Sequence, residues 1–230
     1  MPLPPHLLPE NSGVSFTGSA RRFGMISAIG TVIVSAVYDA ALVAGILSLQ
    51  SPQEPISDPL FSILEILILV LMPFMVGLMV AVHAWSPAET KAFSLMALAF
   101  GSLLAGLTLA VHFVLLTMSR QAAFANFTWM PLFLSFRWPS IPYALDILAW
   151  DVFFAVSALF AAPVFGGSRL ALSIRALLTA SGVLALAGLS GVAFHKMQLR
   201  NIGIIGYAGL FPVAALLIAI LFYQAKPRVF

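Results

Sequence analysis

The sequence lacks cysteine and has few charged residues, and each shortage excludes a class of protein. Without cysteine, the chain of 230 residues has no disulfide, no thiolate metal site and no cysteine nucleophile. Charged residues make up only 8% of the chain, whereas soluble domains carry about 25%. That is too little polar surface to cover a soluble fold. The net charge of +3 comes from scattered basic residues, which gives no indication of nucleic-acid binding.

Apolar residues are what the chain has in abundance. They make up 61% of the sequence, and the mean hydropathy is +1.06. A helix needs about 20 apolar residues to cross a bilayer, and six stretches are long enough: 24–49, 60–84, 92–117, 143–165, 176–195 and 202–224. We therefore predict an all-α integral membrane protein, with one six-helix transmembrane domain over residues 24–230.

Prolines mark the irregular parts of this architecture. Residues 1–23 begin with a proline-rich stretch and lack the pattern of a signal peptide, so they are interpreted as an irregular arm before an uncleaved first helix. Pro73 and Pro212 fall inside apolar stretches and are expected to kink their helices.

The basic residues also predict an orientation, because they favour the cytoplasmic side. Placing the N-terminus inside puts seven basic residues in the cytoplasm: Arg21, Arg22, Lys91, Arg169, Arg175, Lys226 and Arg228. Four then lie outside: Arg120, Arg137, Lys196 and Arg200. This predicts a multi-pass protein of the cell membrane with both termini cytoplasmic.

Residues 118–142 are too polar and too rich in proline to span a membrane. They carry six aromatic residues of the kind that settle at the headgroup level: Phe124, Phe127, Trp129, Phe133, Phe136 and Trp138. We interpret the segment as an interfacial or re-entrant loop on the outer face. A floppy connector with incidental aromatics is the alternative.

The chain also contains a possible internal repeat. Asp39 and Asp151 each follow an aromatic residue and are 112 residues apart, and His83 and His195 have the same separation. Three helices per half would make residues 24–117 and 137–224 inverted repeats, as in many transporters. Six evenly spaced helices give similar offsets without any repeat, so both explanations stay open.

Four of the eight acidic residues fall within predicted membrane spans: Asp39, Glu65, Asp146 and Asp151. An ionisable side chain at mid-membrane costs roughly 2.5–3.5 kcal/mol on insertion scales, so such residues normally face the bundle interior and mark function. Glu65 and Asp146 lie near helix ends, where an interfacial position would also explain them. Asp39 and Asp151 are too deep for that explanation.

Helical spacing and orientation together predict a one-sided pocket. Ser27, Thr31, Ser35 and Asp39 follow at intervals of four and form an inward polar stripe. In the predicted orientation, Glu65, His112, Asp146 and Asp151 gather in the outer half of the membrane, beneath the aromatic loop. Asp39 would form the floor of this pocket, and Asp151 would line its deep end.

These residues favour acid–base chemistry on a lipid-soluble substrate. Carboxyl groups in an apolar pocket can stay protonated at neutral pH, and a histidine can relay their protons. The predicted catalytic residues are Asp39, Glu65, His112, Asp146 and Asp151. Aromatic walls stabilise positive charge, and the predicted wall residues are Tyr38, Tyr143, Trp150, Phe153 and Phe154. We expect an isomerase or cyclase acting on an isoprenoid-like substrate, with a membrane lipid or hydrophobic small molecule as partner and no cofactor.

Three other functions remain open at this stage. Intramembrane Asp and His pairs also serve proton-coupled transporters of small solutes. His112 and His195 are candidate ligands for a metal or haem, although they lie on different helices without a diagnostic spacing. The polar residues would also suit packing in an accessory subunit of a larger membrane complex.

Overall fold

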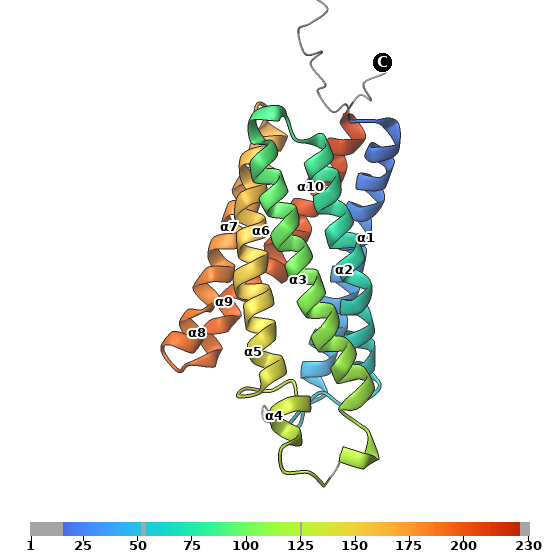
Figure 1. Ribbon diagram of the computed structural model, residues 1–230, viewed down its shortest axis with the longest axis vertical. Coiled ribbons are helices and arrows are strands. Elements are labelled where there is room, and N and C mark those ends of the chain that lie inside the picture. Colours follow the sequence, from blue (N-terminus) through green and yellow to red (C-terminus); the bar gives the residue numbers. More distant parts are fainter. Residues whose placement is uncertain (1–15, 52–53, 125, 226–230) are drawn as a thin grey trace, which may run out of the picture.

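The computed structural model describes residues 16–51, 54–124 and 126–225, and this part of the chain is a bundle of helices (Figure 1). Six helices are long and apolar enough to cross a membrane. The first three are α1 (Gly18–Leu47), α2 (Leu60–Trp85) and the pair η2 (Ala88–Thr90) with α3 (Lys91–Met118). This bears out the all-helical class and the predicted number of helices long and apolar enough to span a membrane.

The last three long helices are each composed of several segments. The fourth joins α5 (Ile141–Ile147), η4 (Leu148–Phe154), α6 (Ala155–Ala161) and η5 (Ala162–Val164). The fifth joins α7 (Arg169–Gly188) and α8 (Ser190–Ala193). The sixth joins η6 (Met197–Arg200), α9 (Asn201–Ile204), η7 (Ile205–Leu210) and α10 (Phe211–Gln224). The short helices η3 (Ala122–Phe124) and α4 (Met130–Leu134) lie between the third and fourth.

Side-chain caps explain where several helices begin. The hydroxyl of Thr17 accepts a hydrogen bond from the backbone N–H of Ala20, so α1 begins at Gly18 rather than near residue 24. The predicted arm is correspondingly shorter, and residues 1–15 of it lie outside the described part. Ser168 caps the fifth helix in the same way, so that helix begins at Arg169 rather than near residue 176.

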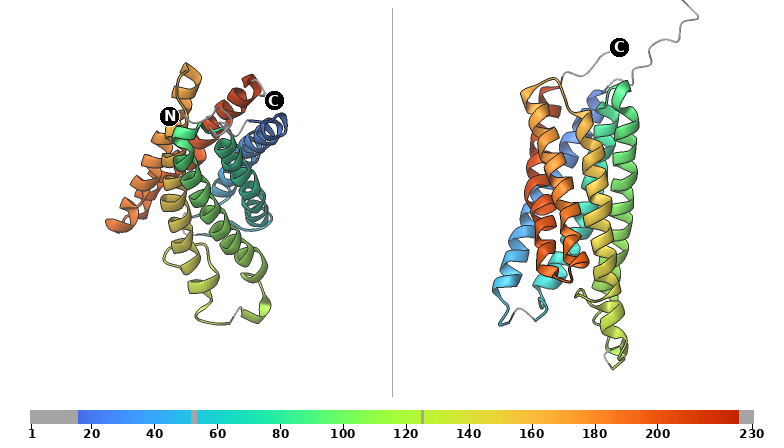
Figure 2. Two further views of the ribbon diagram at one scale, coloured as in Figure 1. Left: turned by 45° about the horizontal axis from the view of Figure 1, so that its top comes forward. Right: turned by 90° about the vertical axis from the view of Figure 1, so that its left-hand side faces the viewer.

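The bundle has two different ends, which Figures 1 and 2 show. At the termini end, α1 begins and α10 finishes. At the opposite end, here called the loop end, η3 and α4 project from the bundle. The predicted orientation, with the loop end outside, stays a prediction. Lys226 and Arg228, which contributed to it, lie outside the described residues.

Small residues allow α1 to approach its neighbours closely. A Cβ on Gly24 would lie 2.7 Å from the Cβ of Ala81, and one on Gly77 would lie 2.5 Å from the Oγ of Ser27. Ser27, Thr31 and Ser35 are all buried against the bundle, as the stripe pattern predicted. Thr31 satisfies its hydroxyl within the helix by donating to the carbonyl of Ser27 at 2.9 Å.

The fourth and sixth helices each contain a π-helical segment, η4 and η7. Such segments interrupt regular α-helix and are frequent at functional sites. Pro212 is the second residue of α10, in the first turn after η7, where its missing N–H is accommodated. Pro73, by contrast, lies within α2, which continues to Trp85.

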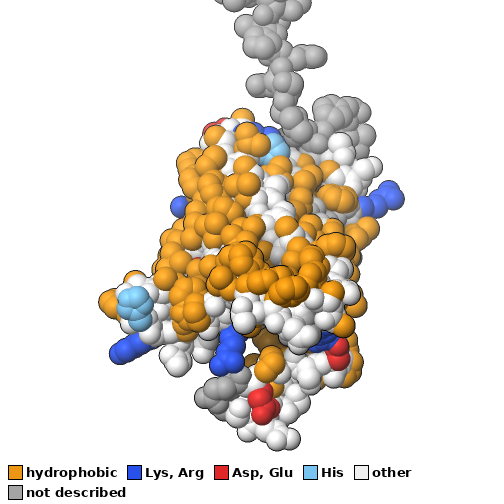
Figure 3. Space-filling view, turned by 60° about the horizontal axis from the view of Figure 1, so that its bottom comes forward, with side chains coloured by type: hydrophobic (Ala, Val, Ile, Leu, Met, Phe, Trp, Pro, Cys, Tyr) orange, Lys and Arg blue, Asp and Glu red, His pale blue; other side chains and the backbone are white. Residues whose placement is uncertain are grey.

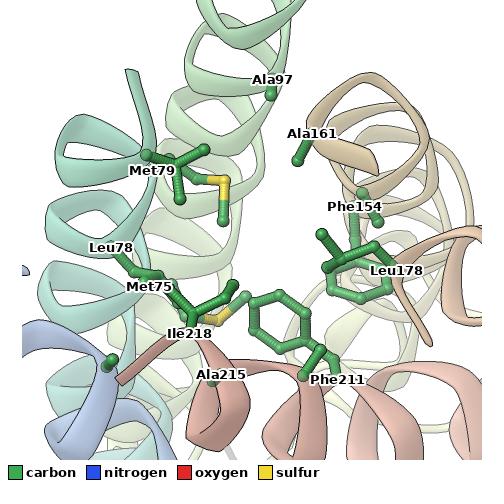
Figure 4. Packing of buried hydrophobic residues seen from close by; sticks show 14 of the residues in the cluster. Met75, Leu78, Met79, Ala97, Phe154, Ala161, Leu178, Phe211, Ala215 and Ile218 are labelled. Atoms are coloured by element: carbon green, nitrogen blue, oxygen red, sulfur yellow. The ribbon is translucent and has the colours of Figure 1, made fainter. Parts of the chain in front are cut away.

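Toward the termini end, the space between the helices is filled by a packed hydrophobic core (Figure 4). The rings of Phe154 and Phe211 meet edge to face, with centroids 5.1 Å apart. The small cavity beside them, lined by Met75 and Met79 among others, has a volume of only about 10 Å³. The residues around Phe154 and Phe211 are therefore closely packed.

The outer surface of the bundle is apolar. Large hydrophobic side chains on several helices are exposed, including Ile26, Ile33, Ile66, Leu103, Leu172, Val183 and Leu216. A soluble monomer rarely exposes contiguous apolar surface on this scale. The surface is therefore compatible with a multi-pass membrane protein.

Candidate functional site

The site begins with a buried contact between α2 and α3. Nδ1 of His112 lies 2.8 Å from Oε2 of Glu65, and each residue is only 4% exposed. An ionised carboxylate accepts hydrogen bonds but cannot donate them, so Nδ1 carries the proton when Glu65 is ionised. Glu65 thereby fixes the orientation of the imidazole ring.

The other ring nitrogen of His112 faces a second carboxylate. Nε2 lies 3.5 Å from Oδ1 of Asp146, on α5, and makes no hydrogen bond within the described residues. The imidazole thus stands between carboxylates from two different helices. A histidine so placed can take a proton on one nitrogen and release one from the other.

Arg200 extends the network to the sixth helix. Its Nη2 donates to Oδ2 of Asp146 at 2.7 Å, and its Nε donates to Oδ2 of Asp151 at 2.9 Å. The guanidinium also lies over the ring of Tyr143, 4.7 Å from its centroid. The sequence placed Arg200 in an outer loop. Instead it is 5% exposed at the end of η6, because two carboxylates offset the cost of burying its charge.

Asp151 lies at a different place from the one expected. Its side chain is completely buried, and its Oδ1 has no hydrogen-bond partner within the described residues. A Cβ added to Gly188 or Gly203 would lie 2.8 or 2.6 Å from this oxygen. Asp151 lines neither of the two cavities described below. It lies behind Arg200 and positions that guanidinium, rather than forming the deep end of a pocket.

Beside this network is a cavity of about 200 Å³, here called the inner chamber. Polar side chains in its wall come from α1, α3, α5 and η6. The aromatic and apolar ones come from the first, second, fourth and sixth long helices and from the segment before α5. Its lining is Ser35, Tyr38, Asp39, Leu42, Ile68, Leu71, His112, Phe136, Tyr143, Asp146, Trp150, Arg200, Ile204, Tyr207 and Ala208. The side chain of Asp39 makes no hydrogen bond or ion pair within the described residues.

A second cavity of about 700 Å³, the outer vestibule, lies toward the loop end. It shares four lining residues with the inner chamber: Tyr38, Leu42, His112 and Phe136. Glu65 borders only the vestibule, and Asp146 borders only the chamber. Figure 3 shows the loop end, where charged side chains border a hollow in the apolar surface. His112 therefore connects a carboxylate in the vestibule to one in the chamber.

The residues at the vestibule rim link the loops of this end. Arg120 pairs with Asp58, and its guanidinium lies 4.2 Å from the ring centroid of Phe61. The aromatic segment beyond it is exposed, with the rings of Phe127 and Trp129 stacked at 5.2 Å. An interfacial role for this segment stays a prediction.

Several predicted residues lie away from the chamber. Phe154 is packed in the core, and Phe153 contacts Phe100 with ring centroids 6.0 Å apart. His195 is exposed in the turn between the fifth and sixth helices, at φ 55°. His83 bonds to Ser94 at 2.9 Å, away from this network. His112 and His195, the predicted ligands for a metal or haem, do not border a common cavity among the two described above.

Sequence reasoning missed Arg200, Tyr207 and Phe136 as parts of the site. For Arg200 a signal existed, because two aspartates within one apolar helix need a nearby cation if both are buried and ionised. Among the described residues, no group of three or more His, Cys, Asp or Glu side chains is arranged to hold a metal ion. Both nitrogens of His112 already face carboxylates.

No protein-family model, curated protein or solved structure matches the chain. The chemistry of the chamber is therefore the basis for a functional proposal. It combines an unpaired carboxyl group, a carboxylate paired with arginine, a histidine between two carboxylates and aromatic walls. These groups can donate, accept and relay protons beside an apolar ligand.

Proposed function

We propose that the chain is an integral membrane enzyme that isomerises or cyclises a lipid-soluble, isoprenoid-like substrate by acid–base chemistry in the inner chamber. The observation that supports this most is the link from Asp146 in the chamber, through His112, to Glu65 in the vestibule. The packed core around Phe154 and Phe211 favours a site reached from one end only.

The two chamber carboxyl groups are suited to opposite roles because their surroundings differ. Asp39 has no cationic partner in the described part of the chain, so it is assigned the transferable proton. Asp146 pairs with Arg200 at 2.7 Å, and this ion pair requires an ionised carboxylate. Asp39 is therefore the general acid, and Asp146 is the general base.

The reaction begins when Asp39 donates its proton to one carbon of a substrate double bond. The π electrons form the new C–H bond and leave a positive charge on the neighbouring carbon. In an isomerisation, Asp146 then removes a proton from an adjacent carbon, and that C–H electron pair forms the new double bond. In a cyclisation, a second double bond attacks the cation before the proton is lost. Either way, the substrate gains one proton and loses one.

The remaining polar residues restore and position these groups. His112 takes the proton from Asp146 at Nε2 and releases another from Nδ1 to Glu65, which borders the vestibule. The matching return of a proton to Asp39 completes the cycle. Arg200 holds Asp146 in place through one hydrogen bond, and Asp151 holds Arg200 through another.

Deuterium incorporation tests the proposal with a mixture of lipids in place of one chosen substrate. Purified protein in lipid nanodiscs is incubated in D₂O with a membrane lipid extract, and mass spectrometry searches for a lipid that gains carbon-bound deuterium. The Asp39→Asn and Asp146→Asn variants should each slow incorporation about 10²–10⁴-fold. Glu89 is exposed in η2, the short helix between α2 and α3 at the termini end of the bundle (Figure 1). It provides the control variant Glu89→Gln. Absence of incorporation by the parent protein, or equal rates in all variants, would overturn the proposal.

A proton-coupled transporter is the second candidate, and the π-helical segments favour it. Trp150 of η4 and Tyr207 of η7 both border the chamber, with ring centroids 5.0 Å apart. Such segments are frequent at functional sites, and a break in two helices beside the chamber would suit alternating access. Solute-dependent proton flux into proteoliposomes, abolished by Asp146→Asn, would favour transport over the enzyme.

A further inference from the structure

We propose that the inner chamber binds the positively charged head of a lipid-soluble amine, with Asp39 as its counter-ion. The inference rests on the proposed function in taking the chamber as the substrate site. It adds the class of ligand that the chamber recognises. A bound amine would occupy the place where the protonated substrate carries its charge.

The charges around the chamber favour a cation. Among the lining side chains, only His112 and Arg200 can carry positive charge, and both already face carboxylates. Asp39 is the lining carboxyl group that has no such partner among the described residues. An anionic ligand would meet no free donor cation here, whereas an ammonium group would complete an ion pair with Asp39.

An unsatisfied polar atom also points to a ligand. Nε2 of His112 is buried without a hydrogen-bond partner within the described residues, in a side chain that is 4% exposed and borders the chamber. A buried polar atom without a partner is costly, by about 1–3 kcal/mol. An ammonium group in the chamber can donate an N–H hydrogen bond to Nε2 when that nitrogen is unprotonated.

Aromatic faces line the same space. Tyr38, Tyr143, Trp150 and Tyr207 all border the chamber, and the guanidinium of Arg200 already lies over one of these rings, that of Tyr143. A cation over an aromatic face gains about 0.5–2 kcal/mol, more where water is excluded. The walls therefore favour an ammonium group over a neutral polar head.

The remaining walls favour an amphiphile over a small soluble cation. Leu42, Ile68, Leu71, Ile204 and Ala208 contribute an apolar side to the chamber. The helix α1 packs along α2 and α10 but makes little contact with α9 or η7, although α1, α9 and η7 all border the chamber. Figure 2 (right) shows α1 crossing the sixth helix and lying away from it at the loop end. The proposal therefore places the hydrocarbon chain of the ligand along this apolar side, between α1 and the sixth helix.

The experiment uses Trp150 as a reporter of binding. Trp85, Trp129 and Trp138 are replaced by Phe, which leaves Trp150, in the chamber wall, as the single tryptophan. Its fluorescence is followed in lipid nanodiscs during titration with dodecylamine, dodecanol, dodecanoic acid and methylammonium. We expect a saturable change with dodecylamine at concentrations on the order of tenfold lower than for the other three probes.

Variants identify the counter-ion. Asp39→Asn should weaken dodecylamine binding by on the order of tenfold, Asp39→Glu should retain it, and Glu89→Gln should match the parent. Thermal unfolding of each variant is measured alongside, and Asp39→Glu keeps the test decisive if the asparagine variant is unstable. If dodecylamine binding is unchanged in a folded Asp39→Asn variant, Asp39 is not the counter-ion and the proposal fails.

The probes separate the other outcomes. Equal binding of dodecanol would overturn recognition of a cation, and equally tight binding of methylammonium would overturn the requirement for a lipid chain. Because Trp150 reports binding without turnover, this test is independent of deuterium incorporation. Amine binding without incorporation would refute the proposed reaction alone, and incorporation without amine binding would refute this inference alone.

Discussion

Arg200 and Asp146, which are 54 residues apart, form a buried ion pair at 2.7 Å between the sixth and fourth long helices. The same guanidinium holds Asp151 at 2.9 Å, so one cation joins two carboxylates of the fourth helix. This ion pair holds Asp146 in the chamber wall, where its carboxylate faces His112. The stability of the bundle and the geometry of the site therefore depend on the same contact.

Replacing Arg200 with methionine should destabilise the protein strongly. The change leaves Asp146 and Asp151 buried without their cation, which costs about 3–5 kcal/mol when one partner of a buried pair is removed. Thermal and denaturant unfolding in detergent measure the loss. The neighbouring Lys196 is exposed, so Lys196→Met is the matched control and should unfold like the parent. Equal stability of both variants would contradict a structural role for the ion pair.

Gly203→Ala should disturb the support behind Arg200. The new Cβ would lie 2.6 Å from Oδ1 of Asp151, which requires the fully buried carboxylate or its helix to move. Such overpacking costs about 1–3 kcal/mol. At Gly209 the nearest atom to an added Cβ lies 4.0 Å away, so Gly209→Ala should be tolerated. Unfolding measurements that rank the two variants in the reverse order would count against this packing.

The Glu65→Gln variant should slow the proposed reaction while leaving the fold intact. Glutamine retains a hydrogen bond to His112 but cannot accept the relayed proton, so deuterium incorporation should fall on the order of 10²-fold. His83, which bonds to Ser94 outside both cavities, provides the control His83→Gln. A full rate in Glu65→Gln would remove Glu65 from the relay.

Reporter fusions test the sidedness of the bundle. Fusions after Leu49 and after Met197 should be active outside, and a fusion after Trp85 should be active in the cytoplasm. These positions follow α1, begin the sixth helix and end α2, respectively. The opposite pattern would reverse the predicted orientation, and the chamber would then open toward the cytoplasm.

Much of the fold follows from the sequence because it depends on apolar length and spacing. The inward stripe of Ser27, Thr31 and Ser35 needed only the period of an α-helix. The convergence of Glu65, His112 and Asp146 needed only alternating helix directions and similar depth. Both depend only on the regular period of an α-helix and on depth along the bundle axis, and the spacing of residues in the sequence gives both directly.

The parts that sequence reasoning missed depend on departures from that regularity. The π-helical segment η4 hydrogen-bonds over a wider turn than an α-helix, so the face on which Asp151 and Phe154 lie differs from a regular projection. Arg200 was excluded from the sixth helix because a charge lowers hydropathy, and only a tertiary contact with two carboxylates reveals why it is buried. Whether the two halves are inverted repeats stays a prediction. Asp39 lines the chamber, whereas Asp151 is completely buried behind Arg200.

The packed core beneath the chamber has an energetic consequence for the proposed enzyme. Because the residues around Phe154 and Phe211 are closely packed, the proposed mechanism has protons enter and leave by the vestibule. Moving one charge across a membrane is worth about 2.3 kcal/mol per 100 mV, but here no charge crosses. Turnover should therefore be indifferent to membrane voltage, and a cell whose membrane is depolarised would keep this activity.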